Sequence, residues 1–438
     1  MLSAPDVACA DSVAGFVACL RELKLHAGNP SFEELRRRCG VPSSTLADAL
    51  QPGRDRPPRL DVVQRFVAAC GVAPDGWPAW EAAWRAVSVP VAARPASVPH
   101  QLPGWPDRLA GRHGELRQLD DLRRLARRRA RRGMLALLVG PAGVGKTALA
   151  LNWAHARSGD HPDGQLYLDL LGSAARPPVA PTDALRQLLV ALGTRPGEVP
   201  ESLSARAALY RSQTYRRRLL VVLDNARDAQ QVRLLLPGGP GCTTLVTSRN
   251  RLSALVAVEG GTRLSLAPLP ADDAAALVAM VLAPGRADAE PDAVRELVRL
   301  CGALPLALRI ASANLADRPQ WSIAGYVGRL AAGNRLAQLA LAGDEATAVA
   351  SAFRLSYAAL SGPARRVFRG LATMPQPDFT VEDLVAATGR PVAETERQVE
   401  VLAAAHLVEP IGPGRYTVHD LLRLYAASLS RAAPRRVA

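Results

Sequence analysis

The sequence predicts a multidomain chain with a central α/β domain, built on a parallel sheet, between two mainly helical parts. Short apolar runs alternate with helical patterns in residues 107–270, as in a sheet covered by helices on both faces. Residues 88–106 contain five prolines and almost no charge, which indicates a linker. Residues 271–430 have a helical pattern almost throughout. The expected strands are 134–139, 165–170, 219–223, 243–247 and 262–266.

Composition narrows the class of protein. The chain has 438 residues, 48% of them hydrophobic and 21% charged, which is typical of a folded chain with several cores. No apolar run approaches the ~18 residues that a membrane helix needs. The first twelve residues contain Asp6 and Asp11 but no Lys or Arg, unlike a secretory signal. Six cysteines are scattered without a CxxC spacing, so we expect a reducing compartment, a cytoplasmic location and no membrane partner.

The net charge of +14 predicts an anionic partner, but its distribution is uneven. Residues 1–90 contain ten basic and ten acidic side chains, whereas residues 91–133 contain eleven basic and four acidic ones. The run Arg123–Arg132 follows leucines at helical spacing. It indicates an amphipathic helix with a solvated basic face, or an electrostatic contact with DNA or an acidic partner.

A phosphate-binding loop follows the first expected strand. The segment GPAGVGKT at residues 140–147 matches GxxxxGK[ST], with an apolar run before it and a helical pattern after it. In such a loop backbone N–H groups surround phosphate oxygens, Lys146 reaches the β- and γ-phosphates, and the Thr147 hydroxyl binds Mg²⁺. The residues expected to hold the nucleotide here are Gly140, Pro141, Ala142, Gly143, Val144, Gly145, Lys146, Thr147 and Ala148.

A second metal-side carboxylate is expected at the end of a neighbouring strand. The run LLVVL is followed by Asp224, which we expect to complete the Mg²⁺ site with Thr147. The next residue is Asn225, which cannot act as a base toward water. Asp228 is a possible substitute, although an acid that begins a helix is the simpler interpretation. We therefore expect slow or absent hydrolysis.

Further motifs occur in a fixed order. They are Gly111-Arg112, Thr247-Ser248-Arg249, Gly302-Ala-Leu-Pro305-Leu306 and Val418-His419-Asp420. With the phosphate loop, this set resembles the NB-ARC branch of the STAND signalling NTPases. In particular, residues 107–430 resemble the nucleotide-binding core of actinobacterial transcriptional regulators.

The resemblance implies roles for single residues. Arg112 would line the nucleotide near its base and ribose, and Arg249 would face the terminal phosphate, acting with Lys146 and Asp224. Pro305 and Leu306 would pack against adenine, and His419 would touch the β-phosphate of ADP. The alternative interpretations, which the residues alone favour less, are a surface residue for Arg249, a helix-start histidine for His419 and the first residue of a helix for Pro305. Val418 and Asn225 depart from the family's motifs.

The N-terminal part resembles a lambda-repressor-like helix-turn-helix. Ser31 and Glu34 form a capping box before a helix that ends at Gly40, and residues 43–50 form the next helix. Flanking helices are expected around 12–25, 60–70 and 78–87. The second helix has few base-reading side chains, so DNA binding and protein recruitment both stay open. The DNA-binding candidates are Arg36, Ser43, Ser44, Thr45 and Arg54.

The last part resembles the winged-helix domain of the same family. Thr380 to Asp383 form a capping box, residues 399–410 are expected to form the long helix, and residues 412–420 the wing. Family members usually carry a repeat domain after the winged helix. We therefore expect a separate sensor protein, or a shortened form of the chain.

These expectations define one organisation and one function. The expected function is an ADP- or ATP-binding, Mg²⁺-dependent switch that regulates transcription through an N-terminal DNA-binding domain and assembles with copies of itself when ATP is bound. The alternatives are an adaptor that recruits a protein and a housekeeping ATPase, against which Asn225 argues. The expected domains are helix-turn-helix 1–87, linker 88–106, P-loop domain 107–270, helical domain 271–350 and winged-helix domain 351–438.

Overall fold

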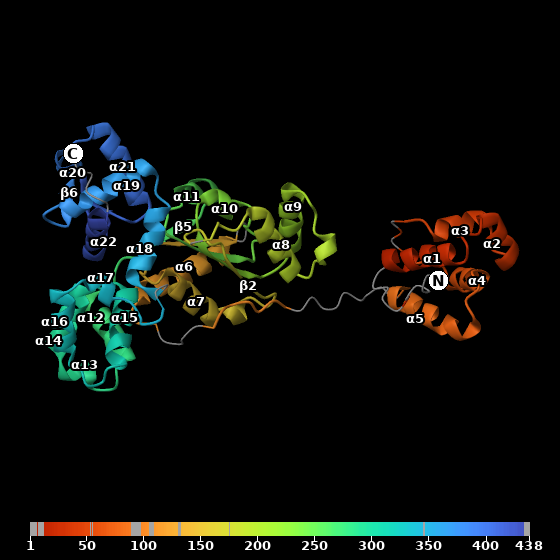
Figure 1. The fold of residues 1–438 in the computed structure, drawn as a ribbon, viewed down its shortest axis with the longest axis horizontal. Coiled ribbons are helices and arrows are strands. Elements are labelled where there is room, and N and C mark those ends of the chain that lie inside the picture. Colours follow the sequence, from red (N-terminus) through yellow and green to blue (C-terminus); the bar gives the residue numbers. More distant parts are fainter. Residues whose placement is uncertain are drawn as a thin grey trace. The chain divides into compact units, whose positions relative to one another are not determined.

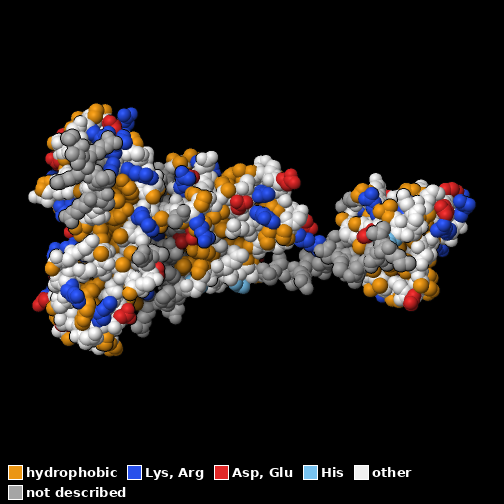
Figure 2. Space-filling model, viewed as in Figure 1, with side chains coloured by type: hydrophobic (Ala, Val, Ile, Leu, Met, Phe, Trp, Pro, Cys, Tyr) orange, Lys and Arg blue, Asp and Glu red, His pale blue; other side chains and the backbone are white. Residues whose placement is uncertain are grey.

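The computed structural model has two compact units, Met1–Ser97 and Val98–Ala438 (Figure 1). Lys and Arg side chains are spread over both units among hydrophobic and other groups (Figure 2). The structure describes residues 7, 13–52, 54, 56–88, 98–104, 109–129, 133–174, 176–344 and 347–432.

The first unit is helical in its described part. Ser31 caps the second helix by accepting the Glu34 N–H at 3.1 Å, and Gly40 ends it in the left-handed conformation. Phe16 and Trp80 are both buried and meet edge-to-face with ring centroids 6.1 Å apart. The helices are α1 Val13–His26, α2 Phe32–Cys39, α3 Ser43–Ala49, α4 Leu60–Ala69 and α5 Trp77–Ser88.

The second unit contains the expected parallel sheet. All five runs form strands. The run 134–139 is apolar throughout and almost fully buried, as in a strand covered on both faces, whereas the run 262–266 lies at the edge of the sheet and is mostly exposed. Their order in the sheet is β2-β3-β4-β1-β5. The strands are β1 Met134–Val139, β2 Gln165–Asp169, β3 Leu220–Ala226, β4 Thr243–Ser248 and β5 Thr262–Ser265.

Two details of the Asp224 strand differ from expectation. β3 does not neighbour β1, since β4 lies between them and pairs with both. β3 also continues past Asp224 to Ala226, with an irregular register and with Asn225 at φ 55°. The strand between β1 and β3, β4, brings the Thr247 hydroxyl within 2.5 Å of Asp224 Oδ1.

Helices cover both faces of the sheet, as Figure 1 shows. One hydrophobic core includes alternate residues of β1 together with α8, α9 and α10. The other core joins the opposite face to α6 and α7 and extends through the following helices as far as Ala426. The helices are α6 His113–Arg129, α7 Lys146–Ala156, α8 Pro181–Ala191, α9 Leu203–Thr214, α10 Ala229–Arg233 and α11 Ser253–Glu259.

A helical segment follows the sheet and packs into the same core. Pro305 begins α15 at its first turn, where its missing N–H is tolerated. The Leu306 N–H donates to the Gly143 carbonyl at 3.1 Å, which ties α15 to the phosphate loop. The helices are α12 Ala271–Val281, α13 Arg286–Ala289, α14 Pro291–Leu300, α15 Pro305–Ala316, α16 Ile323–Ala332 and α17 Arg335–Gln338.

The C-terminal segment combines helices with a small antiparallel sheet in the order β6-β8-β7. Thr380 and Asp383 form the expected capping box. The long helix predicted over 399–410 is wrong in its bounds, because His406 has φ 52° and residues 409–412 form a strand. The elements are α18 Val349–Ala358, α19 Gly362–Gly370, β6 Asp378–Thr380, α20 Val381–Thr388, α21 Val392–Ala404, β7 Glu409–Gly412, β8 Arg415–Thr417 and α22 Asp420–Ala432.

The end of the expected linker is attached to the sheet. The Gln165 N–H donates to the Pro99 carbonyl at 2.6 Å, and Gln101 donates to the Gln165 carbonyl at 3.0 Å. This part of the linker therefore belongs to the second unit. Within the described ranges, no helix is both long and apolar enough to cross a membrane.

Candidate functional site

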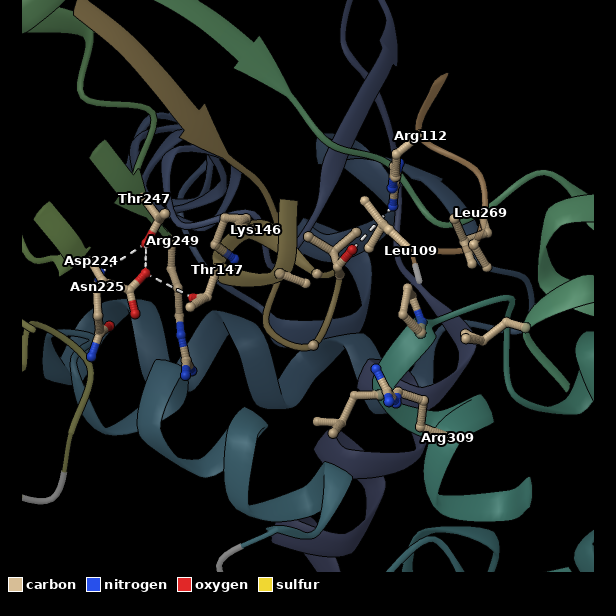
Figure 3. Close-up of a pocket in the computed structure, with 18 of the residues that line it drawn as sticks. Leu109, Arg112, Lys146, Thr147, Asp224, Asn225, Thr247, Arg249, Leu269 and Arg309 are labelled. Carbon is tan, nitrogen blue, oxygen red and sulfur yellow. Dashed lines mark hydrogen bonds between the residues drawn. The ribbon is translucent and has the colours of Figure 1, made fainter. Parts of the chain in front are cut away.

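A pocket of about 370 Å³ opens at the carboxyl edge of the parallel sheet (Figure 3). Asp224, Asn225, Thr247 and Arg249 lie at one end, and Leu109, Arg112, Leu269 and Arg309 lie at the other. Ligands bind at this edge in open α/β sheets. The predicted residues that line the pocket are Arg112, Gly143, Val144, Gly145, Lys146, Thr147, Ala148, Asp224, Arg249, Pro305 and Leu306.

The loop between β1 and α7 requires its glycines. Gly140, Gly143 and Gly145 have φ of 152°, 78° and 96°, which other residues adopt only with strain. A Cβ on Gly140 would lie 2.6 Å from the Leu266 carbonyl oxygen, and one on Gly143 would lie 2.9 Å from Leu306 Cβ. The loop therefore approaches its neighbours closely and leads directly into the N-terminus of α7, a suitable place for phosphate.

Lys146 is buried at the start of α7. Its Nζ donates to the carbonyls of Gly140 at 2.9 Å and Pro141 at 2.8 Å. These two loop residues therefore hold the lysine in place, and they do not line the pocket. Burial, and secondarily the Arg249 charge, lowers the pKa of Lys146 to about 7, against the influence of Asp224. Ala142 is buried in the core and also lies outside the lining.

Asp224 accepts hydrogen bonds from three hydroxyl groups. Its Oδ1 accepts from Thr147 at 2.8 Å and Thr247 at 2.5 Å, and its Oδ2 accepts from Tyr167 at 3.1 Å. Burial and the Asp224 charge raise the pKa of Tyr167, so this hydroxyl stays a donor. Thr247 was named only as part of the Thr247-Ser248-Arg249 motif, without a role, and Tyr167 was not predicted.

The donor set at Asp224 fits Mg²⁺. A hydroxyl and a carboxylate provide the oxygen ligands that this ion takes, with nucleotide phosphates and water completing its shell. The described residues contain no group of three or more His, Cys, Asp or Glu side chains that could hold a metal by themselves. Thr147 and Asp224 would therefore hold the ion together with a phosphate.

The position after Asp224 has no base. The Asn225 side chain lines the pocket, and its Nδ2 donates to Asp169 Oδ1 at 3.4 Å. Asp228 lies outside the lining and caps α10 by accepting the Gln231 N–H at 2.9 Å. Asp228 is therefore a helix-start acid, as the simpler interpretation expected.

Arg249 connects the pocket to the C-terminal segment. It lines the pocket from the end of β4, and its Nη1 donates to the Ala352 carbonyl at 2.6 Å and to Ser356 Oγ at 2.9 Å. Both acceptors belong to α18. Burial lowers the pKa of Arg249 to about 10, while Asp224 acts in the opposite direction. One guanidinium thus reaches both the pocket and a helix more than a hundred residues further along the chain.

Arg112 supports the loop at the other end. It is 6% exposed, and its Nη2 donates to the carbonyls of Val144 at 3.1 Å and Ala267 at 2.6 Å. Its Nη1 donates to Glu115 at 2.8 Å. The guanidinium is therefore held by acceptors of the protein while its side chain lines the pocket. Lining residues that were not predicted here are Leu109, Ala110, Leu269, Leu277 and Arg309.

His419 lies outside the pocket lining. Its Nε2–H donates to the Gly302 carbonyl at 3.0 Å, and its Nδ1 accepts the Leu421 N–H at 3.2 Å. Burial lowers the pKa of His419, so the ring is neutral with both nitrogens engaged. The histidine thus contacts the backbone three residues before Pro305, on the segment that leads into the pocket.

The DNA-binding candidates of the first unit are partly engaged with acids. Ser43 Oγ donates to Glu33 at 2.9 Å, and Arg36 pairs with the same carboxylate. Arg54 Nη1 donates to the Asp48 carboxylate at 2.6 Å. Of the remaining two candidates, Ser44 is exposed and Thr45 is half-buried.

The fold and the phosphate loop together define the class, a P-loop ATPase fold. The chain resembles the Walker-type ATPase PABY2304 of Pyrococcus abyssi with a TM-score of 0.51 at 14% identity, over 76% of this chain and 99% of that one. This likeness supports the fold alone. No protein-family model matches the chain.

Curated relatives are named Regulatory protein AfsR. The protein from Streptomyces coelicolor is 40% identical over 340 residues, which are 77% of this chain and 34% of that protein. The protein from Streptomyces griseus is 39% identical over 328 residues, or 75% of this chain and 33% of that protein. This chain therefore spans about a third of the length of the curated relatives it matches.

Proposed function

We propose that this chain is a nucleotide-dependent switch that regulates transcription, of the STAND NB-ARC type, with ADP and ATP as its ligands. One observation carries the proposal. Arg249 lines the pocket, and the same guanidinium donates hydrogen bonds to α18. The similarity to two regulatory proteins supports the regulatory role.

The pocket would hold the nucleotide along its length. The base would lie at the end lined by Leu109, Leu269 and Pro305, and the phosphates at the loop before α7. Thr147 and Asp224 would hold Mg²⁺, which neutralises phosphate charge when bound. Arg309 lines the base end one helical turn after Pro305, so it would contact the base or the ribose.

Exchange of ADP for ATP would change what Arg249 binds. A terminal phosphate offers a stronger acceptor than a neutral carbonyl and a hydroxyl, because both partners are then ionised. Arg249 would move toward it and release α18, which begins the C-terminal segment. Asn225 supplies no base, so hydrolysis would be slow and the ATP state long-lived. In this account the C-terminal segment acts as a winged-helix lid, and His419 acts through Gly302.

The direct test is calorimetric titration of the full chain with ADP and ATP, each with Mg²⁺. The proposal expects micromolar or tighter binding of at least one of them, lost in Lys146→Ala. Failure to bind either nucleotide at micromolar concentrations would end it.

The first unit would deliver the output as a helix-turn-helix, with α3 as the recognition helix. A second candidate is an adaptor whose first unit recruits a protein. The engagement of Arg54 with Asp48 and of Ser43 with Glu33 favours this candidate, since these groups are less available to DNA. Salt-dependent, sequence-specific duplex binding that Thr45→Ala weakens would favour the first function over the second.

A further inference from the structure

A second hollow, of about 280 Å³, lies at the amino edge of the parallel sheet. Its lining comes from the end of α6, from the turn before β2 and from the segments that lead into β3 and β4. These strands run parallel, so their amino ends share one edge, opposite the phosphate loop. β1 has six residues, which at 3.3 Å each separate the two edges by about 20 Å.

Basic side chains outnumber acidic side chains in the lining of this hollow. Arg123, Arg127 and Arg218 line it together with a single carboxylate, Asp160. Asp160 pairs with Arg123 at 2.5 Å and with Arg127 at 3.4 Å, and its backbone carbonyl accepts from Arg218 at 2.9 Å. Asp163, just beyond the lining, accepts the Arg218 backbone N–H at 2.6 Å. The one lining carboxylate therefore pairs with two guanidinium groups, and the third, that of Arg218, has only a backbone carbonyl of the same residue as its acceptor in the hollow.

The histidine in the hollow does not change this balance. Burial lowers the pKa of His161, and its ring contacts the Arg157 carbonyl and the Thr243 hydroxyl, each at 3.0 Å. Burial, followed by the Arg127 charge, also lowers the pKa of Arg123, against the influence of Asp160. The arginines thus repel one another in a partly enclosed space, which an additional anion would relieve.

We propose that this amino-edge hollow binds the phosphate backbone of duplex DNA. Residues 1–90 have equal numbers of basic and acidic side chains, so backbone charge must be neutralised largely by the rest of the chain. Tyr215 is 61% exposed and Arg216 is exposed in the segment that carries Arg218, which extends the surface beyond the hollow. Basic side chains with a polar aromatic neighbour suit phosphate and sugar contacts.

The surface gives a role to the basic run at the end of α6, which the nucleotide site does not use. This proposal rests on the proposed function in one respect, namely that the chain binds DNA. The contacts of the surface would be independent of sequence and would add to those of α3, which alone would carry base recognition.

The test uses the full chain and a 30-base-pair duplex of random sequence. Affinity is measured by fluorescence anisotropy at several salt concentrations, for wild type and for Arg127→Gln/Arg218→Gln. Both side chains are largely exposed, with Arg127 at 53%, so the exchange should leave the fold intact, which thermal unfolding checks. The matched control is Arg295→Gln/Arg299→Gln on α14, where the side chains are 71% and 65% exposed and each has its own acidic partner.

Loss of two phosphate contacts should reduce the slope of log K against log salt by about 1.8, and the affinity at 0.1 M salt by roughly 60-fold. The control variant should retain the wild-type slope. An unchanged slope in the double variant would overturn the proposal. So would a loss confined to a fluorescent phosphoserine peptide, with duplex binding unchanged. ADP titration of the same variant separates the two ideas, because the nucleotide site about 20 Å away should be unaffected. Normal ADP binding together with an unchanged salt slope for duplex binding would refute the DNA-binding surface without contradicting the nucleotide-dependent switch.

Discussion

Replacing Arg249 with methionine should separate ATP from ADP binding. The exchange keeps most of the side chain's length and removes its charge. In the structure, two hydrogen bonds to α18 are lost, at Ala352 and Ser356. When ATP is bound, the contact to its terminal phosphate is lost instead. ADP has no such phosphate, so its affinity should stay within about threefold of wild type.

The magnitudes follow from the structure. Two hydrogen bonds from a charged donor contribute about 3–6 kcal/mol. Burial, which lowers the pKa of Arg249 to about 10, costs the charged form about 3 kcal/mol. The net loss of stability is therefore only about 0–3 kcal/mol. One lost charged contact of about 1.5–3 kcal/mol reduces the ATP affinity by roughly 10- to 150-fold.

The assay is calorimetric titration of ADP and of a non-hydrolysable ATP analogue, with urea unfolding to measure stability. Arg251→Met is the matched control, because Arg251 lies outside the pocket lining and its contact to Ala404 is made by the backbone. Equal losses for the two nucleotides, or none for either, would refute the role given to Arg249.

Three further predictions concern the pocket and its surroundings. Burial lowers the pKa of Lys146 to about 7, and bound phosphate would raise it again, so binding takes up a proton. Nucleotide affinity should therefore fall by up to tenfold per pH unit above pH 7, and titrations between pH 7 and 9 that show no such fall would contradict this. Asn225→Asp should raise the ATP turnover rate by supplying a carboxylate, as phosphate release would measure, and an unchanged rate would mean that the base is not what is missing. Gly302→Ala places a Cβ 2.3 Å from His419 Cε1, whereas Gly343→Ala, also at positive φ, meets nothing within 4 Å. Urea unfolding should show the first variant to be less stable than the second by about 1–3 kcal/mol. Equal stabilities would mean that the His419 ring can move away from the added methyl group at no cost in free energy.

The strands were predictable because their signal is local. Each strand has its own short apolar stretch, unbroken in β1 and interrupted by polar residues in β5, so β1 to β5 could be found without knowing their neighbours. Their order could not be found this way. In the sheet β4 lies between β1 and β3, and no residue in these runs indicates that position. The long helix was misplaced because the turn at His406 has no glycine or proline to indicate it.

The site residues likewise include some that a local sequence signal reveals and some that only the fold brings together. Lys146 and Thr147 belong to one continuous motif, and the structure places both in the pocket. Leu109 lies two residues before the Gly111-Arg112 motif and Leu269 lies outside every motif, so neither was singled out. Arg309 had a usable signal, since it follows Pro305 by four residues on a helix and therefore shares its face.

The measurement that tests the central claim most directly is the nucleotide that co-purifies with the full chain, released by denaturation and identified by chromatography. A switch that is held closed predicts near-stoichiometric ADP in the wild type and none in Lys146→Ala. A wild-type protein that carries no nucleotide, and that binds neither ADP nor ATP when titrated, would contradict the account.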